Sequence, residues 1–204
     1  MITLNKDIQD NITPSKALEL LKEGNQRFLN KKQENRDLNK QVDLTGGGQF
    51  PYAVVLSCID SRVPVEHVLD QGIGDIFSTR VAGNIVNEDV LGSIEYSCKV
   101  AGSKLVLVMG HTKCGAVTAA CKGVELGNIT ALLSKIKPAV KTINPSEKEF
   151  DDKLIEDVSI QNVKDSIENI KKQSPILKEM DDNNEIDIVG AIYDVNSGFV
   201  TFMD

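Results

Sequence analysis

Three short apolar runs constrain the fold more than any other feature of the chain. They read YAVVLS at residues 52–57, DIFSTRV at 75–81 and KLVLVMG at 104–110. Such runs, rich in β-branched residues and without polar alternation, are typical of strands buried on both faces of a parallel sheet. Helical patterns at residues 64–71 and 87–102 lie between them. The sequence therefore predicts an α/β fold with a central, mostly parallel β-sheet covered by helices on both faces.

A helical arm is predicted before this sheet. Thr13 is suited to cap a helix and Pro14 to occupy its first position, and apolar residues then recur at helical spacing up to Phe28. After this helix the periodicity is lost, and the glycines at 46–48 indicate a loop. We therefore expect an N-terminal helical arm over residues 1–45.

The C-terminal part continues the α/β pattern. Small residues at 115–124 favour a closely packed helix, and residues 128–182 are more polar and mostly helical, with interruptions at prolines. Residues 185–202 indicate a strand, a turn and a second strand. We expect a single domain over 1–204, in which residues 50–204 form the α/β core with the C-terminal helices and strands.

Composition excludes several classes of function. The net charge of −7 argues against a nucleic-acid partner, because phosphate binding needs a clustered basic face. With no tryptophan and 4% aromatic residues, the chain lacks a stacking platform for single strands or sugars. No window reaches the roughly 18 apolar residues of a membrane span, and the N-terminus lacks the form of a secretory signal. A cytoplasmic protein with no membrane partner and with reduced cysteines is expected.

Rare residues gather where two of the predicted strands end. Cys58, Asp60 and Arg62 follow the first run, and His111 and Cys114 follow the third. The carboxyl ends of parallel strands meet at one edge of a sheet, where such folds place their sites. Two thiolates and an imidazole favour zinc, and three protein ligands leave a fourth position open, as in catalytic zinc sites.

A plainer interpretation applies to isolated cysteines. A lone His-x-x-Cys pair is weak evidence for metal, since buried cysteine is more often a small hydrophobic residue. The Cys-x-Asp-x-Arg motif upstream makes metal binding the better interpretation for Cys58 and Cys114. Cys98 and Cys121 lie in helical patterns without companion ligands, so we expect them to serve packing only.

The motifs together carry a family resemblance. CIDSRVP, DIFSTRVAGNIV, SIEYS and GHTKCGAV, supported by ALELLKEGNQRF near the N-terminus and IVGAIYDVNSG near the C-terminus, strongly resemble the β-class carbonic anhydrases. The resemblance covers most of the chain, and Cys-x-Asp-x-Arg followed by His-x-x-Cys is highly specific in this order.

The resemblance implies a carbonic anhydrase, a zinc lyase that reversibly hydrates carbon dioxide to bicarbonate and a proton. One Zn²⁺ per subunit would be held by Cys58, His111 and Cys114. Asp60 and Arg62 would form a catalytic dyad that orients a zinc-bound hydroxide for attack on carbon dioxide.

It also implies a shared substrate site. Gln49, Phe77 and Tyr96 match the family's substrate-binding positions, which are often supplied across a dimer interface. A homodimer or a dimer of dimers, with the arm wrapped around a neighbour, is therefore expected.

The sequence departs from the family at a few positions. Val55 stands where family members with a bicarbonate-closed site have tryptophan, so we expect an open site in which Asp60 pairs with Arg62. Ile59 and the RVAGN stretch change pocket shape without removing a chemical group. His67, the second histidine, is more readily interpreted as a helix surface residue than as a proton shuttle.

Three other functions remain open from the sequence. A hydrolase of carbonyl sulfide or carbon disulfide on the same scaffold would carry the same zinc ligands. A non-catalytic zinc-binding regulatory module would retain the sheet, although TGGGQF precedes a strand and so does not form a phosphate-binding loop. A redox role for Cys58 and Cys114 is the third alternative.

Overall fold

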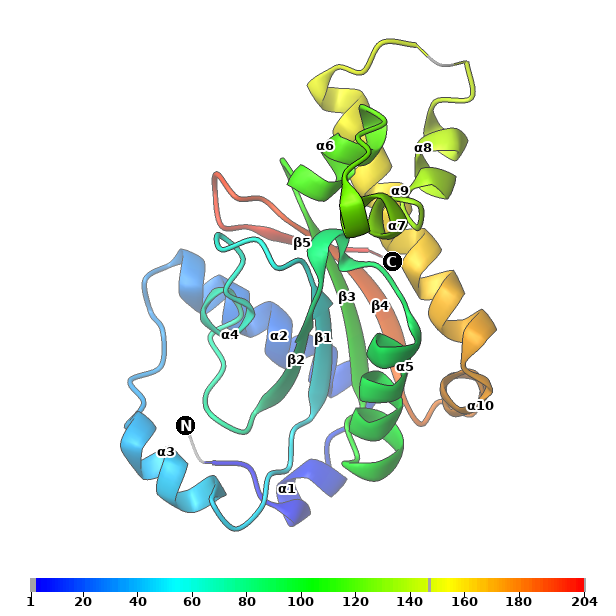
Figure 1. The fold of residues 1–204 in the computed structure, drawn as a ribbon. Coiled ribbons are helices and arrows are strands. Elements are labelled where there is room, and N and C mark those ends of the chain that lie inside the picture. Colours follow the sequence, from blue (N-terminus) through cyan, green and yellow to red (C-terminus); the bar gives the residue numbers. More distant parts are fainter. Residues whose placement is uncertain (1–2, 147, 204) are drawn as a thin grey trace.

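The computed structural model describes residues 3–146 and 148–203. Five strands form one sheet in the order β2-β1-β3-β4-β5 (Figure 1). Their bounds are Ala53–Ser57 for β1, Ile76–Arg80 for β2, Leu105–His111 for β3, Asp187–Tyr193 for β4 and Val200–Phe202 for β5. β1 to β4 are parallel and β5 pairs antiparallel with β4, so the predicted, mostly parallel α/β fold is confirmed.

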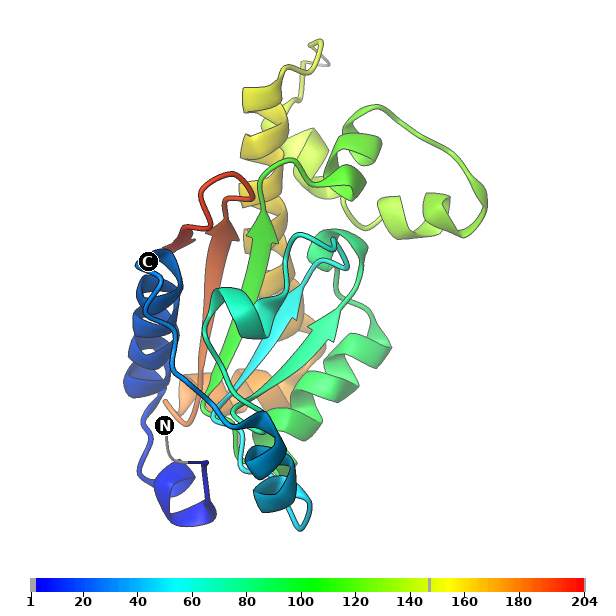
Figure 2. The same cartoon turned by 90° about the vertical axis from the view of Figure 1, so that its left-hand side faces the viewer.

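Helices cover both faces of the sheet (Figure 2). On one face, α2 (Pro14–Leu29) and α4 (Val65–Val68) pack with Val55 and Leu107 in one hydrophobic cluster. On the other face, α5 (Glu88–Glu95), α9 (Asp152–Gln173) and α10 (Pro175–Asp182) pack with Val54 and Val106. Because neighbouring residues of a strand point to opposite faces, β1 and β3 supply both clusters, which explains their continuous apolar runs. The expectation of burial on both faces was wrong for β2, which is an edge strand and only partly buried.

A third hydrophobic cluster lies at the carboxyl ends of the strands. The helices α6 (Gly115–Cys121), α7 (Gly127–Leu133) and α8 (Lys137–Ile143) gather there beside the first half of α9 (Figure 1). Ile136, Ala139 and Val158 are fully buried or nearly so in this cluster, which also contains Cys58 and Cys114. These helices therefore form a cover over the edge of the sheet where the site residues lie.

The helix α2 packs against the core of its own chain. As predicted, α2 begins after Thr13, whose hydroxyl accepts a hydrogen bond from the Lys16 amide. Gly24 allows the helix to approach α4 closely, because a Cβ there would lie 1.8 Å from the Leu69 carbonyl oxygen.

A buried carboxylate, that of Asp70, also holds the N-terminal segment against the core. Asp70 is 4% exposed, and its carboxylate accepts hydrogen bonds from Arg27 of α2, at 2.5 Å, and from Arg36. Burial alone would raise the pKa of Asp70, but the bonds from Arg27 and Arg36 lower it. The charged form of Asp70 therefore joins the end of α4 to the N-terminal segment.

Several local predictions were wrong or incomplete. The segment before the glycines contains α3 (Leu38–Thr45), which begins where the Asp37 side chain accepts a hydrogen bond from the Lys40 amide. A short N-terminal helix, α1 (Lys6–Asp10), was also missed. Both helices are short and mostly exposed, so they lack the apolar stripe from which a helix is predicted.

The remaining irregular elements lie around α5. The turn η1 (Ala82–Asn84) precedes it, and the π-helical turn η2 (Tyr96–Val100) continues it. None of the helices in the described ranges is long and apolar enough to cross a membrane.

Candidate metal centre

The structure brings the three predicted zinc ligands together. Cys58 follows β1, His111 is the last residue of β3, and Cys114 is the N-cap residue directly before α6. Their ligand atoms lie within 4.8 Å of one another, and the three residues are at most 4% exposed. β1 and β3 are adjacent parallel strands, so their carboxyl ends place the three side chains at one point.

The pKa values of Cys58 and Cys114 are shifted in opposite directions. A hydrogen bond from Cys114 lowers the pKa of Cys58 to about 4 against the effect of burial, with further help from the Gly83 amide 3.3 Å away. The pKa of Cys114 is raised because its thiol is the donor to Cys58 and because it is buried. The pair therefore holds one thiolate and one proton that a cation can replace.

An unpaired imidazole nitrogen supports a metal at this point. Nδ1 of His111 lies 2.9 Å from the Thr112 carbonyl oxygen, which makes Nδ1 the donor and leaves a lone pair on Nε2. Within the described residues Nε2 is buried without a hydrogen-bond partner. Two sulfurs, one of them a thiolate, and a nitrogen lone pair that converge on one point fit a zinc ion.

Asp60 and Arg62 lie beside this cluster. The guanidinium of Arg62 donates from Nε to Oδ1 of Asp60 at 2.9 Å and from Nη2 to Oδ2 at 2.7 Å. Oδ2 is also 3.9 Å from Nε2 of His111. The hydrogen bond from Arg62 holds the pKa of Asp60 well below its usual range, although burial opposes it. The carboxylate is therefore ionised and fixed next to the ligand atoms.

Two residues at the carboxyl end of β2 and just beyond it support the site and were not singled out from the sequence. Arg80 donates from Nε to the Cys58 carbonyl at 2.9 Å and from Nη2 to the Asp60 carbonyl at 2.6 Å. Gly83 has φ of +69°, and a Cβ there would lie 2.6 Å from Cδ1 of Ile136. Both belong to the STRVAGN stretch, so their position at a strand end next to β1 was the available signal.

A second support comes from the loop after β4. The Thr112 hydroxyl donates to Asp194 at 3.2 Å and accepts from the Val195 amide at 3.1 Å. Hydrogen bonds, first of all from the Ser197 hydroxyl, lower the pKa of Asp194 to about 2. Because Thr112 follows His111 directly, this loop positions the predicted metal ligand. Asp194 directly follows β4, and its place at a strand end was again the available sequence signal.

The predicted substrate residues lie away from the cluster of the same subunit. Gln49 precedes β1, whereas Cys58 follows it, so the length of this strand, about 16 Å, separates them. The rings of Phe77 and Tyr96 meet edge to face with centroids 6.2 Å apart, and Tyr96 is 53% exposed. His67 lies exposed on α4.

Comparisons with known proteins agree with this geometry. A sequence model of the family described as carbonic anhydrase matches residues 53–200. The chain is 32% identical over 200 residues to carbonic anhydrase 2 of Mycobacterium tuberculosis, covering 95% of each protein. It is 31% identical to the carbonic anhydrase of Mycolicibacterium smegmatis over 93% of each.

The solved structures give the same result at the level of the fold. The β-carbonic anhydrase CafA of Aspergillus fumigatus superposes with a TM-score of 0.75 at 26% identity, over 93% of this chain and 90% of that one. The family match, the relatives at full length and the Cys-His-Cys cluster lead to one assignment. The chain belongs to the β-class carbonic anhydrase family and is a carbonic anhydrase.

Proposed function

We propose that the chain hydrates carbon dioxide reversibly at a zinc ion held by Cys58, His111 and Cys114, with Asp60 and Arg62 orienting the attacking oxygen. The observation that carries this proposal is the buried, unpaired Nε2 of His111, which lies among two thiols and 3.9 Å from the Asp60 carboxylate. Zinc bound there supplies the Lewis acidity that makes water a nucleophile near neutral pH.

The Asp60 carboxylate compensates for a weakly acidifying ligand set. Two thiolates cancel the charge of Zn²⁺, so zinc at this site would lower the pKa of water less than zinc held by three histidines does. Because Arg62 keeps Asp60 ionised, its carboxylate accepts but does not donate a hydrogen bond. The attacking oxygen must therefore direct its hydrogen at Asp60, which leaves a lone pair for the carbon of carbon dioxide.

Arg62 also determines where the carboxylate is held. Its Nη2 donates to the Lys113 carbonyl at 3.2 Å as well as to Asp60, so it links the loop after β1 to the loop after β3. This pairing supports the expected open site, in which Asp60 faces Arg62 rather than taking the fourth zinc position.

The carbon dioxide pocket is proposed to form between two subunits of a homodimer. Within one subunit, Gln49 lies at the opposite end of β1 from the zinc ligands. β2 is an edge strand that pairs only with β1 among the described strands, and the exposed Tyr96 lies near it on Phe77. A twofold axis along this edge would bring Gln49, Phe77 and Tyr96 of one subunit to the metal centre of its partner.

A mixing experiment tests the shared site. Gln49→Ala and Cys58→Ser subunits are each expected to be inactive, by loss of a substrate contact and of a zinc ligand. When they are unfolded and refolded together, half of the dimers combine both subunits and contain one intact site. Activity should return to about a quarter of the wild-type value. No recovery would show that Gln49 does not act across an interface.

The catalytic assignment is tested by stopped-flow hydration of carbon dioxide. Asp60→Asn keeps the size of the side chain, and kcat/KM should fall by about 10- to 100-fold while zinc remains bound. Cys121→Ser, a conservative change outside the ligand cluster, serves as the control and should retain full activity. Full activity in Asp60→Asn would contradict the assignment.

A further inference from the structure

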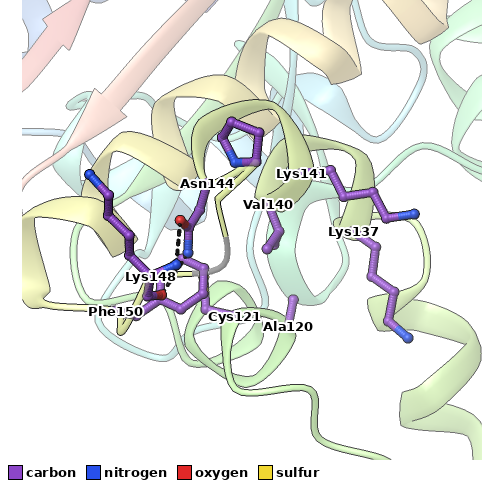
Figure 3. A pocket seen from close by; sticks show the side chains of 9 residues that line it. Ala120, Cys121, Lys137, Val140, Lys141, Asn144, Lys148 and Phe150 are labelled. Carbon is purple, nitrogen blue, oxygen red and sulfur yellow. Dashed lines mark hydrogen bonds between the residues drawn. The ribbon is translucent and has the colours of Figure 1, made fainter.

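The long helix α9 contacts two different regions of the described chain. The segment that leads into it borders an open pocket together with α6 and α8. The side chains of Lys137 and Lys148 point outward on opposite sides of this pocket, so its charged groups do not converge (Figure 3). The middle of α9 packs against β3 and η1, in the hydrophobic cluster that contains Cys58 and Cys114. This part of the helix is therefore the one that can act on the metal centre.

Three buried polar residues lie on one face of α9. Ser159, Asn162 and Ser166 are 4%, 3% and 3% exposed, and their spacing of three and four residues places them on the same side of the helix. The Ser159 hydroxyl donates to the Ile155 carbonyl of its own helix at 3.1 Å. Asn162 and Ser166 instead donate their hydrogen bonds out of the helix.

Both of these outward bonds go to the turn η1. Nδ2 of Asn162 donates to the Gly83 carbonyl at 2.8 Å, and the Ser166 hydroxyl donates to the Asn84 carbonyl at 3.1 Å. The turn needs support because φ is +69° at Gly83 and +42° at Asn84, a region that disfavours a residue with a side chain. The amide of the same Gly83 donates to Sγ of Cys58 at 3.3 Å. Asn162 therefore reaches a predicted zinc ligand through a single residue of η1.

We propose that Asn162 and Ser166 are positioning residues, which hold the Gly83 amide on the Cys58 sulfur and thereby set how much charge this sulfur gives to the metal. This role presupposes the proposed zinc site. A thiolate that accepts a hydrogen bond donates less charge to a metal ion, and such bonds tune metal centres in proteins. Because two thiolates offset the charge of Zn²⁺, the bond from Gly83 leaves zinc at this site a stronger Lewis acid than it would otherwise be.

Cobalt substitution tests the role of these residues without relying on activity. Co²⁺ in the place of zinc gives an absorption band from sulfur-to-metal charge transfer, whose energy falls when the sulfur loses a hydrogen bond and holds its electrons less tightly. The variant Asn162→Leu keeps the approximate size of the side chain but removes the donor, so we expect its band at longer wavelength than in the wild type. Ser166→Ala should move the band in the same direction but by less, because the bond from Asn162 to Gly83 remains.

The pH profile of carbon dioxide hydration gives a second readout on the zinc-loaded protein. The kcat/KM of Asn162→Leu should fall by about tenfold near pH 7, the lower end of the effect of such supporting residues. It should recover as the pH rises, because a weaker Lewis acid activates water only at higher pH. The matched control is Ser159→Ala, which removes an equally buried hydroxyl that bonds only within α9. Both its band and its pH profile should equal those of the wild type.

The proposal is overturned if the band and the pH profile are unchanged in both Asn162→Leu and Ser166→Ala at full metal content. An equal shift in Ser159→Ala overturns it as well, because the effect would then not depend on the bonds to η1. If Asn162→Leu does not fold, the comparison of Ser166→Ala with Ser159→Ala decides. Failure of the zinc site itself gives a different result, since the cobalt-loaded wild type would then show no sulfur-to-metal band.

Discussion

Replacing Arg62 by alanine tests how the carboxylate of Asp60 is held. The change removes the two guanidinium bonds to Asp60, at 2.9 and 2.7 Å, and the bond to the Lys113 carbonyl. It leaves the Arg62 backbone amide, which donates to Oδ1 of Asp60 at 3.0 Å. The carboxylate therefore stays near the metal centre but loses its fixed angle and its positive neighbour.

The size of the effect follows from the exposure of the pair. Removing a group that orients a metal-site residue typically lowers activity by about 10- to 100-fold. The Arg62 side chain is 48% exposed, so water replaces part of its interaction, and one bond to Asp60 persists. We therefore expect kcat/KM to fall by about tenfold, the lower end of the range, with zinc retained. The kcat/KM of Arg62→Lys should lie between those of Arg62→Ala and the wild type, because lysine keeps the charge but not the bidentate geometry.

The assay is stopped-flow hydration of carbon dioxide from about pH 5 to about pH 9. In the wild type, Asp60 is ionised throughout this range because its pKa is held far below it. Without Arg62, burial remains and raises the pKa of Asp60, so activity should decline on the acid side at a higher pH than in the wild type. Added guanidinium should restore part of the rate, and the exposed Lys172→Ala variant should behave as the wild type. Unchanged kcat/KM and an unchanged pH profile at full zinc content would refute this account of Arg62.

Three further predictions concern the support of the site. Gly83→Ala should lower the free energy of unfolding by about 1–3 kcal/mol, and Tm by roughly 5 °C, because φ is +69° there; calorimetry measures both. The folded-state pKa of Asp194 is about 2 against an ordinary 3.8, so its charge stabilises the fold above pH 3.8, and this stability is lost as the pH falls towards 2. Asp194→Asn should therefore be less stable than the wild type to urea at neutral pH, and the difference should shrink below about pH 4. Removal of the metal with a chelator should make Cys58, with a pKa of about 4, react with maleimide faster than Cys121, with a pKa of about 11, by peptide mapping.

The strands and the candidate metal ligands could be predicted from the sequence for a physical reason. A strand buried on both faces must be apolar throughout, so β1 and β3 could be located, and with them the residues that follow their carboxyl ends. Cys58, His111 and Cys114 then converge because β1 and β3 are adjacent.

Contacts that depend on the order of the strands in the sheet could not be predicted from the sequence. Arg80 contacts the backbone of Cys58 because β2 pairs with β1 in a register that sets Arg80 opposite Ser57. Asp194 reaches Thr112 because β4 pairs with the other side of β3. Neither pairing leaves a local pattern in the sequence, since apolar runs predict strands but not their neighbours.

The short helices show a different limit. α3 depends on a cap at Asp37 and on few buried side chains, so its apolar periodicity is too weak to distinguish it from a loop. The position of Gln49 matched the family motif, yet a motif does not say in which subunit a residue acts. That question depends on an assembly, which is why the mixing experiment is needed.

The central claim is that Cys58, His111 and Cys114 hold the catalytic zinc. Zinc K-edge X-ray absorption of the purified, zinc-loaded protein tests it most directly. The account predicts a four-coordinate ion with two sulfur ligands at about 2.3 Å and two lighter ligands at about 2.0–2.1 Å. The sulfur number should fall to one in Cys58→Ser. A shell of four sulfurs, or one without sulfur, would contradict the claim.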